Sequence, residues 1–137
     1  MTFEHEHTVT TSASPADVWA LWSSVGCWHA WDPKVQQVAL EGHFGEGAAG
    51  TIVLTGGTEV PFVLEIVEPH ARYLDRLSLD DHVIRIDHQV RPVESGAEVT
   101  VRTTIEGPGA HELGPTVTND TPSALASLVR LAEKKSI

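Results

Sequence analysis

The alternation of apolar and polar residues along the chain predicts a sheet of about seven strands between helices near its two ends. The strand-like runs are rich in valine, isoleucine and threonine, and short turns with glycine, proline or aspartate separate them. They cover residues 3–11, 35–41, 51–55, 58–67, 72–79, 83–91 and 97–106. Apolar residues recur at helical spacing in two other segments, residues 14–25 and roughly 115–135.

The first helix carries sequence signals at both ends. Ser14 can cap it, Pro15 suits its first position, and Asp17 stands where the acid of a capping box bonds back to the cap. Gly26 is expected to end this helix. The tryptophan-containing stretch that follows, residues 27–33, predicts a short helical turn.

The C-terminal helix has two possible starts. Pro122 either begins it, with Thr121 as the cap, or kinks a longer helix that begins near Pro115. Two glycine-rich segments, residues 42–50 and 107–114, are expected to be loops.

This order of elements predicts a single α+β domain over residues 1–137. An antiparallel sheet beside a long C-terminal helix must bury one sheet face against that helix. With so few elements, the layout leaves a hollow between sheet and helix, and such hollows hold small molecules. We therefore expect an internal cavity there.

Hairpin geometry predicts which side chains of the last two strands share a face. If Pro92 lies opposite Ala97, Arg91 lies opposite Glu98 on one face, and Asp87 lies opposite Arg102. The other face then holds mainly apolar pairs: Val90 with Val99, His88 with Val101, Ile86 with Thr103 and Ile84 with Ile105. Since one register gives both a charged and an apolar face, the apolar face is predicted to point inward.

The same reasoning extends to the two preceding strands. A tight turn at residues 80–81 pairs Leu77 with Ile84, Asp75 with Ile86 and Tyr73 with His88. A turn at residues 69–70 then pairs Ile66 with Tyr73, Leu64 with Asp75 and Phe62 with Leu77. One defect results: Arg76 lies opposite Arg85 on the outer face, where Asp87 on the diagonal is expected to reduce their repulsion.

In this register the inner face is apolar except for Tyr73, Asp75, His88 and Thr103. Polar groups buried without partners cost a few kcal/mol each, so these residues must pair with one another or contact water or a ligand. A histidine oriented by a carboxylate can exchange protons near neutral pH. His88, Asp75 and Tyr73 are therefore the candidate catalytic residues, and a polar cluster that satisfies itself is the alternative.

Residues expected to face the cavity are the candidate ligand-binding set: Trp28, Phe62, Leu64, Leu77, Ile86, Thr103, Leu125 and Val129. We expect no metal and no cofactor. The chain has eight histidines, but none shows the HExxH spacing of a zinc-binding helix. His5 and His7 share one face of the first strand, and the sequence leaves the direction of that face open.

Composition narrows the possible partners. The net charge of −10, from 19 acidic and 9 basic residues, argues against binding to nucleic acids or anionic membranes. No apolar run approaches the ~20 residues that a membrane-spanning helix needs. Cys27 is the only cysteine, so no intramolecular disulfide forms, and we expect it to be a small buried hydrophobe. Because no secretory signal is visible, we expect a cytoplasmic protein. We expect it to be a monomer or a homodimer.

Four segments carry a resemblance to a known superfamily: SASPADVWALWS after the first strand, WHAWDP, EPHARYL at one turn, and TPSALASLVRLAE near the end. Together they resemble the SRPBCC superfamily, which includes START lipid-transfer domains, the birch pollen allergen family, and polyketide cyclases and dehydrases. The resemblance covers residues 3–135. It implies a helix-grip fold, in which a curved antiparallel sheet wraps around the long C-terminal helix with a cavity between them. The superfamily shares no catalytic signature, so the resemblance assigns no catalytic residue.

The resemblance also implies binding of a hydrophobic small molecule, and in some members cyclisation or dehydration of a polyketide. Our leading hypothesis is a hydrophobic or aromatic ligand in the cavity, and whether acid–base chemistry of the cyclase or dehydratase type follows is left open. One alternative is a non-catalytic carrier or sensor of a small molecule or lipid. Another is a regulator that binds a protein, which would need an exposed apolar patch on the outer sheet face.

Overall fold

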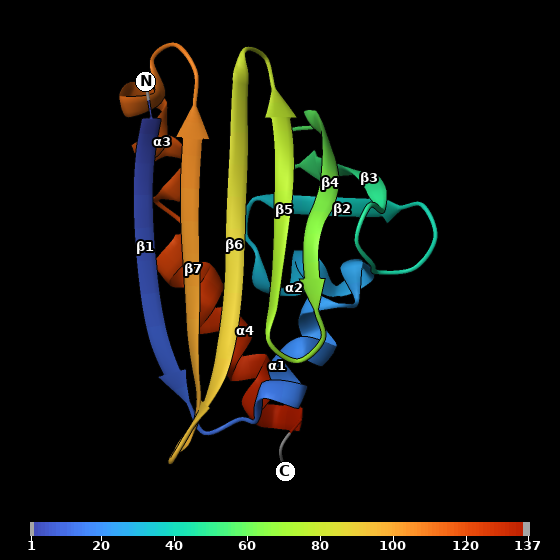
Figure 1. Cartoon of the computed structure of the whole chain (residues 1–137), viewed down its shortest axis with the longest axis vertical. Helices are drawn as coiled ribbons and strands as arrows, with labels where there is room; N and C mark the ends of the chain where they lie inside the picture. Colours follow the sequence, from blue (N-terminus) through green and yellow to red (C-terminus); the bar gives the residue numbers. More distant parts are fainter. Residues whose placement is uncertain (1, 136–137) are drawn as a thin grey trace.

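The computed structural model describes residues 2–135 as a seven-stranded antiparallel sheet with helices packed against one face (Figure 1). The elements in chain order are β1 (Thr2–Thr11), α1 (Pro15–Trp22), the short 3₁₀ turn η1 (Val25–Cys27), α2 (Trp28–Trp31), β2 (Val35–Leu40), β3 (Ala49–Leu54), β4 (Glu59–Glu68), β5 (Arg72–Leu79), β6 (His82–Val93), β7 (Gly96–Glu106), α3 (Ala110–Thr118) and α4 (Thr121–Lys135). The strand order across the sheet is β1-β7-β6-β5-β4-β3-β2. The α+β class and the helix-grip arrangement are confirmed.

The sheet is strongly bent. In Figure 1, β2 runs nearly crosswise to β5, β6 and β7, while α3 and α4 lie behind β1, β7 and β6. Helix α4 contacts β1 at one side and α1 and α2 at the other. Its residues Leu125, Leu128 and Ala132 are buried. The concave face of the sheet and the C-terminal helices therefore enclose the interior between them.

Helix α1 begins as predicted but ends early. Ser14 and Asp17 form the capping box, with Pro15 in the first turn. The helix stops at Trp22 and not at Gly26, and Ser23 caps it: its hydroxyl joins the last helical N–H in donating to the carbonyl of Trp19, both at 2.8 Å. The chain then forms η1, which leaves Cys27 exposed. The expectation that Cys27 is buried is wrong.

The predicted register of β5, β6 and β7 is confirmed. Pro92 pairs with Ala97, His88 with Val101 and Ile86 with Thr103. Between β5 and β6 the pairs are Tyr73 with His88, Asp75 with Ile86, Leu77 with Ile84 and Arg76 with Arg85. At their shared turn, β6 continues two residues further than expected and β7 begins one residue earlier, so that Val93 pairs with Gly96. The polar residues predicted to face inward therefore do so.

The pairing of β4 with β5 departs from the prediction at one point. Phe62 pairs with Leu77 and Leu64 with Asp75 as expected, but Val67, and not Ile66, lies opposite Tyr73. The register shifts between Leu64 and Ile66, so Glu65 is the extra residue of a β-bulge. Turn residues alone do not reveal such an insertion, which is why the hairpin count missed it.

This bulge resolves the like-charge pair on the outer face. The Glu65 carboxylate accepts from Arg76 Nη1 at 2.7 Å and from Arg85 Nε at 3.1 Å. The expected role of Asp87 is wrong, because that carboxylate accepts two hydrogen bonds from Arg72, at 2.9 and 2.8 Å. The outer face of these strands thus carries ion pairs.

The start of the C-terminal helical region also differs from the prediction. Residues 107–114 were expected to be a loop, yet helix α3 begins at Ala110. Gly114 lies inside α3 because a Cβ there would be 2.3 Å from the Phe3 ring, so only glycine allows the helix to pack this close to β1. Helix α4 begins at Thr121, one residue before Pro122, which lacks the N–H that a continuous helix would use.

Replacing the bulged glutamate tests the outer-face arrangement. Glu65→Gln removes the charge between Arg76 and Arg85, so we expect the free energy of unfolding to fall by about 1 kcal/mol. Glu98→Gln is the control, because its partner Arg91 is 66% exposed and the loss should stay below about 0.5 kcal/mol. Urea unfolding of both variants measures the difference, and equal losses would contradict the special role of the bulge.

Candidate functional site

A cavity of about 420 Å³ lies between the concave sheet face, α2 and the junction of α3 with α4. The sheet contributes Val35, Ile52, Leu54, Val60, Tyr73, Asp75, Leu77, Leu79, Ile84, Ile86, His88, Val101 and Thr103 to its wall. The helices and loops contribute Trp22, Trp28, Trp31, Asp32, Lys34, Thr55, Leu113, Thr116, Val117, Asp120, Thr121, Ala124 and Leu125. Most of these side chains are apolar or aromatic, so the few polar groups among them are conspicuous.

Stacked aromatic rings form one wall of the cavity. The rings of Tyr73 and His88 lie parallel, with centroids 3.9 Å apart and an interplanar angle of 6°. Trp28 stacks on Tyr73 with a centroid distance of 5.8 Å. Trp22 meets Tyr73 and His88 edge-on, at 5.5 and 5.6 Å. These contacts fix the ring orientations, because edge-on and stacked pairs are the favoured geometries of aromatic rings.

His88 is held by the backbone and not by Asp75. Its Nδ1 lies 3.3 Å from the carbonyl oxygen of Tyr73, so Nδ1–H is the donor in the neutral ring. Burial lowers the pKa of His88 to about 4 from its ordinary 6.5, and the bonds to the backbone only partly oppose this. At neutral pH the imidazole is uncharged. The sequence-based idea of a histidine oriented by the Asp75 carboxylate therefore has no support in the hydrogen bonds of residues 2–135.

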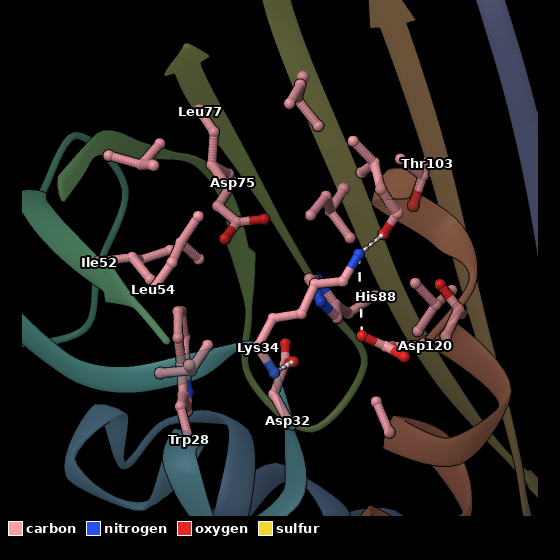
Figure 2. Close-up of a pocket in the computed structure, with 18 of the residues that line it drawn as sticks. Trp28, Asp32, Lys34, Ile52, Leu54, Asp75, Leu77, His88, Thr103 and Asp120 are labelled. Atoms are coloured by element: carbon pink, nitrogen blue, oxygen red, sulfur yellow. Dashed lines mark hydrogen bonds and ion pairs between the residues drawn. The ribbon is translucent and has the colours of Figure 1, made fainter. Parts of the chain in front are cut away.

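Asp75 is a buried polar group of the wall that is only partly satisfied. It is 3% exposed, and its Oδ1 has no hydrogen-bond partner in the part of the chain that the structure describes. Burial raises the pKa of this carboxyl to about 8, with a further contribution from the charge of Asp32 and a partial offset from its own backbone N–H. At neutral pH the side chain is mainly protonated. Figure 2 shows it extending from β5 toward the interior of the pocket.

The polar residues of the wall that reach solvent mark the mouth of the cavity. Lys34 crosses this mouth from the start of β2 (Figure 2), and its Nζ donates to the carbonyls of Thr116 and Val117, the latter at 2.9 Å. Nζ also lies 3.8 Å from Asp120 Oδ2. Burial raises the pKa of the neighbouring Asp32, whose Oδ1 accepts from the backbone N–H of Lys34 at 3.0 Å. Lys34 thus ties the start of β2 to the end of α3 across the opening.

Not every residue of the predicted ligand-binding set lines the cavity. Those that do are Trp28, Leu77, Ile86, Thr103 and Leu125, together with the three candidate catalytic residues. Phe62 and Leu64 are buried in the core instead: Phe62 packs against Trp28 and closely over Gly50. Val129 is half-buried on α4 and lies outside the wall. The inward face of a strand or helix is longer than the cavity, so facing inward was not a sufficient criterion.

Several wall residues escaped the sequence-based prediction. Lys34, Asp32 and Asp120 come from segments without periodic pattern, and Leu113 and Val117 belong to α3, part of which was expected to be a loop. The sequence offers no clear signal for these residues, because the charged side chains of Asp32, Lys34 and Asp120 come together only in the folded chain.

The histidines and the possible metal sites can be placed as well. His5 and His7 lie on the inner face of β1, and His5 Nδ1 is buried without a partner. Among residues 2–135, the structure holds no group of three or more histidine, cysteine or acidic side chains that could bind a metal ion. Over the same residues, none of the helices is long and apolar enough to cross a membrane.

One protein family matches nearly the whole chain. The sequence profile described as "Polyketide cyclase / dehydrase and lipid transport" matches residues 2–133. No curated protein matches the chain.

Solved structures agree on the fold. The crystal structure of Ara h 8.0201 superposes with a TM-score of 0.78 at 14% identity, covering 98% of this chain and 99% of that one. The di-domain ARO/CYC StfQ from the steffimycin biosynthetic pathway gives 0.84 at 11% identity, covering 99% of this chain and 52% of StfQ. Norcoclaurine synthase from Thalictrum flavum, solved with dopamine and hydroxybenzaldehyde, gives 0.74 at 14%, covering 98% and 88%. Identities this low establish the fold alone.

The pKa of Asp75 predicts how stability depends on pH. Between about pH 4 and pH 8 the folded protein keeps a proton that the unfolded chain releases, so the free energy of unfolding falls as pH rises through this range. Asp75→Asn has no such proton, so its stability relative to wild type should increase by at least about 1 kcal/mol from pH 4.5 to pH 8. Denaturant unfolding at several pH values measures this.

The comparison of the two proteins cancels the opposite contribution of His88. With its pKa lowered to about 4, His88 makes stability rise with pH between about 4 and 6.5 in both proteins. Asp81→Asn, in the exposed turn between β5 and β6, serves as the control and should show a constant difference from wild type. A constant difference for Asp75→Asn as well would show that Asp75 ionises normally.

Proposed function

Because this chain belongs to the polyketide cyclase, dehydrase and lipid-transport family, we propose that it binds a hydrophobic or aromatic small molecule between its sheet and its C-terminal helices. The observation that carries this proposal is the cavity of about 420 Å³. Protein interiors are close-packed, and voids of this size are rare unless something fills them. The volume lies in the range of about 300–1,000 Å³ that small-molecule sites occupy.

The wall chemistry favours a flat aromatic ligand. Trp28, Tyr73 and His88 form a stacked group, and Trp22 and Trp31 also line the cavity. Rings that are already fixed by one another lose little conformational entropy when a ligand ring packs against them. Aliphatic side chains from the sheet and from α3 and α4 supply the remaining apolar surface.

The proposal also includes the location, the oligomeric state and the partners of the protein. We propose a cytoplasmic monomer or homodimer whose partner is the small molecule itself, with no nucleic acid, metal or cofactor required. The ion pairs on the outer sheet face support this over a protein-binding regulator, because they leave little apolar surface there for a partner.

Filling the cavity should abolish binding. Ile86→Phe places extra volume into the cavity from β6, so we expect the affinity for the uncharged probe N-phenyl-1-naphthylamine to fall at least about tenfold. Gln89→Phe, exposed on the same strand, is the matched control and should bind like wild type. Probe fluorescence measures both. If Ile86→Phe, shown to be folded by circular dichroism, binds as well as wild type, the probe does not occupy this cavity.

A second candidate function is proton transfer on the bound molecule, as cyclisation and dehydration require. One observation favours it: Asp75 has a pKa of about 8 and an unpartnered oxygen at the cavity wall. A carboxyl group with a pKa near the working pH can both take and return a proton. Its carboxylate form would remove a proton beside a carbonyl group, while Tyr73 and His88, both uncharged, would support the ligand ring.

Deuterium exchange distinguishes this enzyme from a carrier or sensor. With 2-tetralone in heavy water, the exchange rate of its α-protons should rise with pH and level off above about pH 8, where Asp75 is ionised. Asp75→Asn should slow the exchange by roughly 100-fold or more while still binding the ketone. Proton NMR follows the loss of the α-proton signal. A rate no faster than that of buffer alone would leave binding as the only function.

A further inference from the structure

Three buried hydrogen-bonding groups of the cavity-lining residues have no partner within the described residues 2–135. They are Oδ1 of Asp75 and the indole Nε1 atoms of Trp22 and Trp31. All three residues are buried, with 3%, 0% and 6% of their surface exposed. Trp28 shows that the fold can satisfy such a group, because its Nε1 donates to the carbonyl of Trp22 at 2.8 Å. Among residues 2–135, four buried side-chain atoms have no partner, and three of them belong to residues of the proposed ligand site, while the fourth is His5 Nδ1 on β1.

The chemistry of these groups restricts what can satisfy them. An indole N–H can only donate a hydrogen bond, so a partner for Trp22 or Trp31 must be an acceptor. A protonated carboxyl group also donates through its hydroxyl. Because burial keeps Asp75 mainly protonated at neutral pH, all three groups can donate to a ligand. An acceptor-bearing ligand meets their common need, whereas a ligand that offers only donors leaves both indoles unsatisfied.

The charges around the cavity argue against an ionised ligand. An anion would meet the acids Asp32 and Asp120 at the mouth, where the ammonium of Lys34 is already bound to two carbonyls. A cation would have to be buried beside Asp75 in a mainly apolar wall, and its N–H groups could not accept from either indole. An uncharged ligand avoids both costs.

We infer that the cavity selects an uncharged, planar aromatic molecule with ketone-type oxygens, and that Asp75 is the residue that determines this specificity by donating a hydrogen bond to one of them. The inference rests on the proposed ligand-binding function and adds to it the class of ligand and its orientation. The oxygen-bearing end of the molecule lies against Asp75, Trp22 and Trp31, and its rings lie along the stack of Trp28 and Tyr73.

Four naphthalene derivatives of similar size test this. 2-Acetylnaphthalene offers an acceptor, 2-isopropylnaphthalene has nearly the same shape without one, 2-naphthoate is an anion and 2-(aminomethyl)naphthalene is a cation. Equilibrium dialysis at neutral pH gives the dissociation constant of each for wild type, Asp75→Leu and Asp75→Asn. Asp81→Leu, in an exposed turn, is the control.

The expected result has two parts. Wild type binds the ketone at least about tenfold more tightly than either charged compound. The ratio of the hydrocarbon's dissociation constant to the ketone's falls about tenfold in Asp75→Leu, which removes the donor. It stays within about twofold of wild type in Asp75→Asn, whose amide still donates, and in Asp81→Leu.

Each alternative result has a distinct meaning. A preference for the ammonium or the carboxylate compound overturns the inferred ligand class. Equal affinity for ketone and hydrocarbon, with the same ratio in Asp75→Leu, overturns the role of Asp75 but leaves the proposed cavity binding intact. If none of the four compounds binds wild type, the proposed function fails with the inference. The wild-type series decides the ligand class even if a variant does not fold.

Discussion

The register of β5, β6 and β7 determines which groups this protein presents to its interior. Strand residues alternate between faces, so the pairing of β5 with β6 and of β6 with β7 places Tyr73, Asp75 and His88 on the concave side. A slip of β5 by one residue would send Tyr73 and Asp75 outward. Burial then changes their chemistry: it raises the pKa of Asp75 and lowers that of His88 until both are neutral. At neutral pH the sheet wall of the cavity is therefore polar without being charged, and the charged side chains lie at the mouth.

The bulge at Glu65 supports the pairing of β5 with β6 from the outer face of the sheet. Arg76 and Arg85 lie opposite each other on the two strands that carry Asp75 and Ile86, and their repulsion is offset by Glu65, which accepts from both, and by Glu106, which accepts from Arg85. The extra residue supplies the carboxylate to both guanidinium groups. A feature of the outer surface thus supports the register that the inner surface requires.

Much of the fold and part of the site could be predicted from the sequence. Hairpins are local, so turn residues and opposite-charge pairs were sufficient to align Asp75 with Ile86 and His88 with Val101. The bulge at Glu65 was missed because it changes no local pattern. Helix α3 was missed because Gly114 reads as a loop residue, while its real role is the close approach of the helix to Phe3.

By itself, the sequence determined the class of fold, the order of elements and the polar residues of the inner face, because these depend on periodicity and nearest-neighbour pairing. Only the tertiary structure decided where the hollow ends. It excluded Phe62 and Val129 from the wall and brought in Lys34 and Asp120 from segments far apart in the chain. It also separated His88 from Asp75, since hydrogen-bond partners in a core depend on side-chain packing in three dimensions, which no spacing along the chain records.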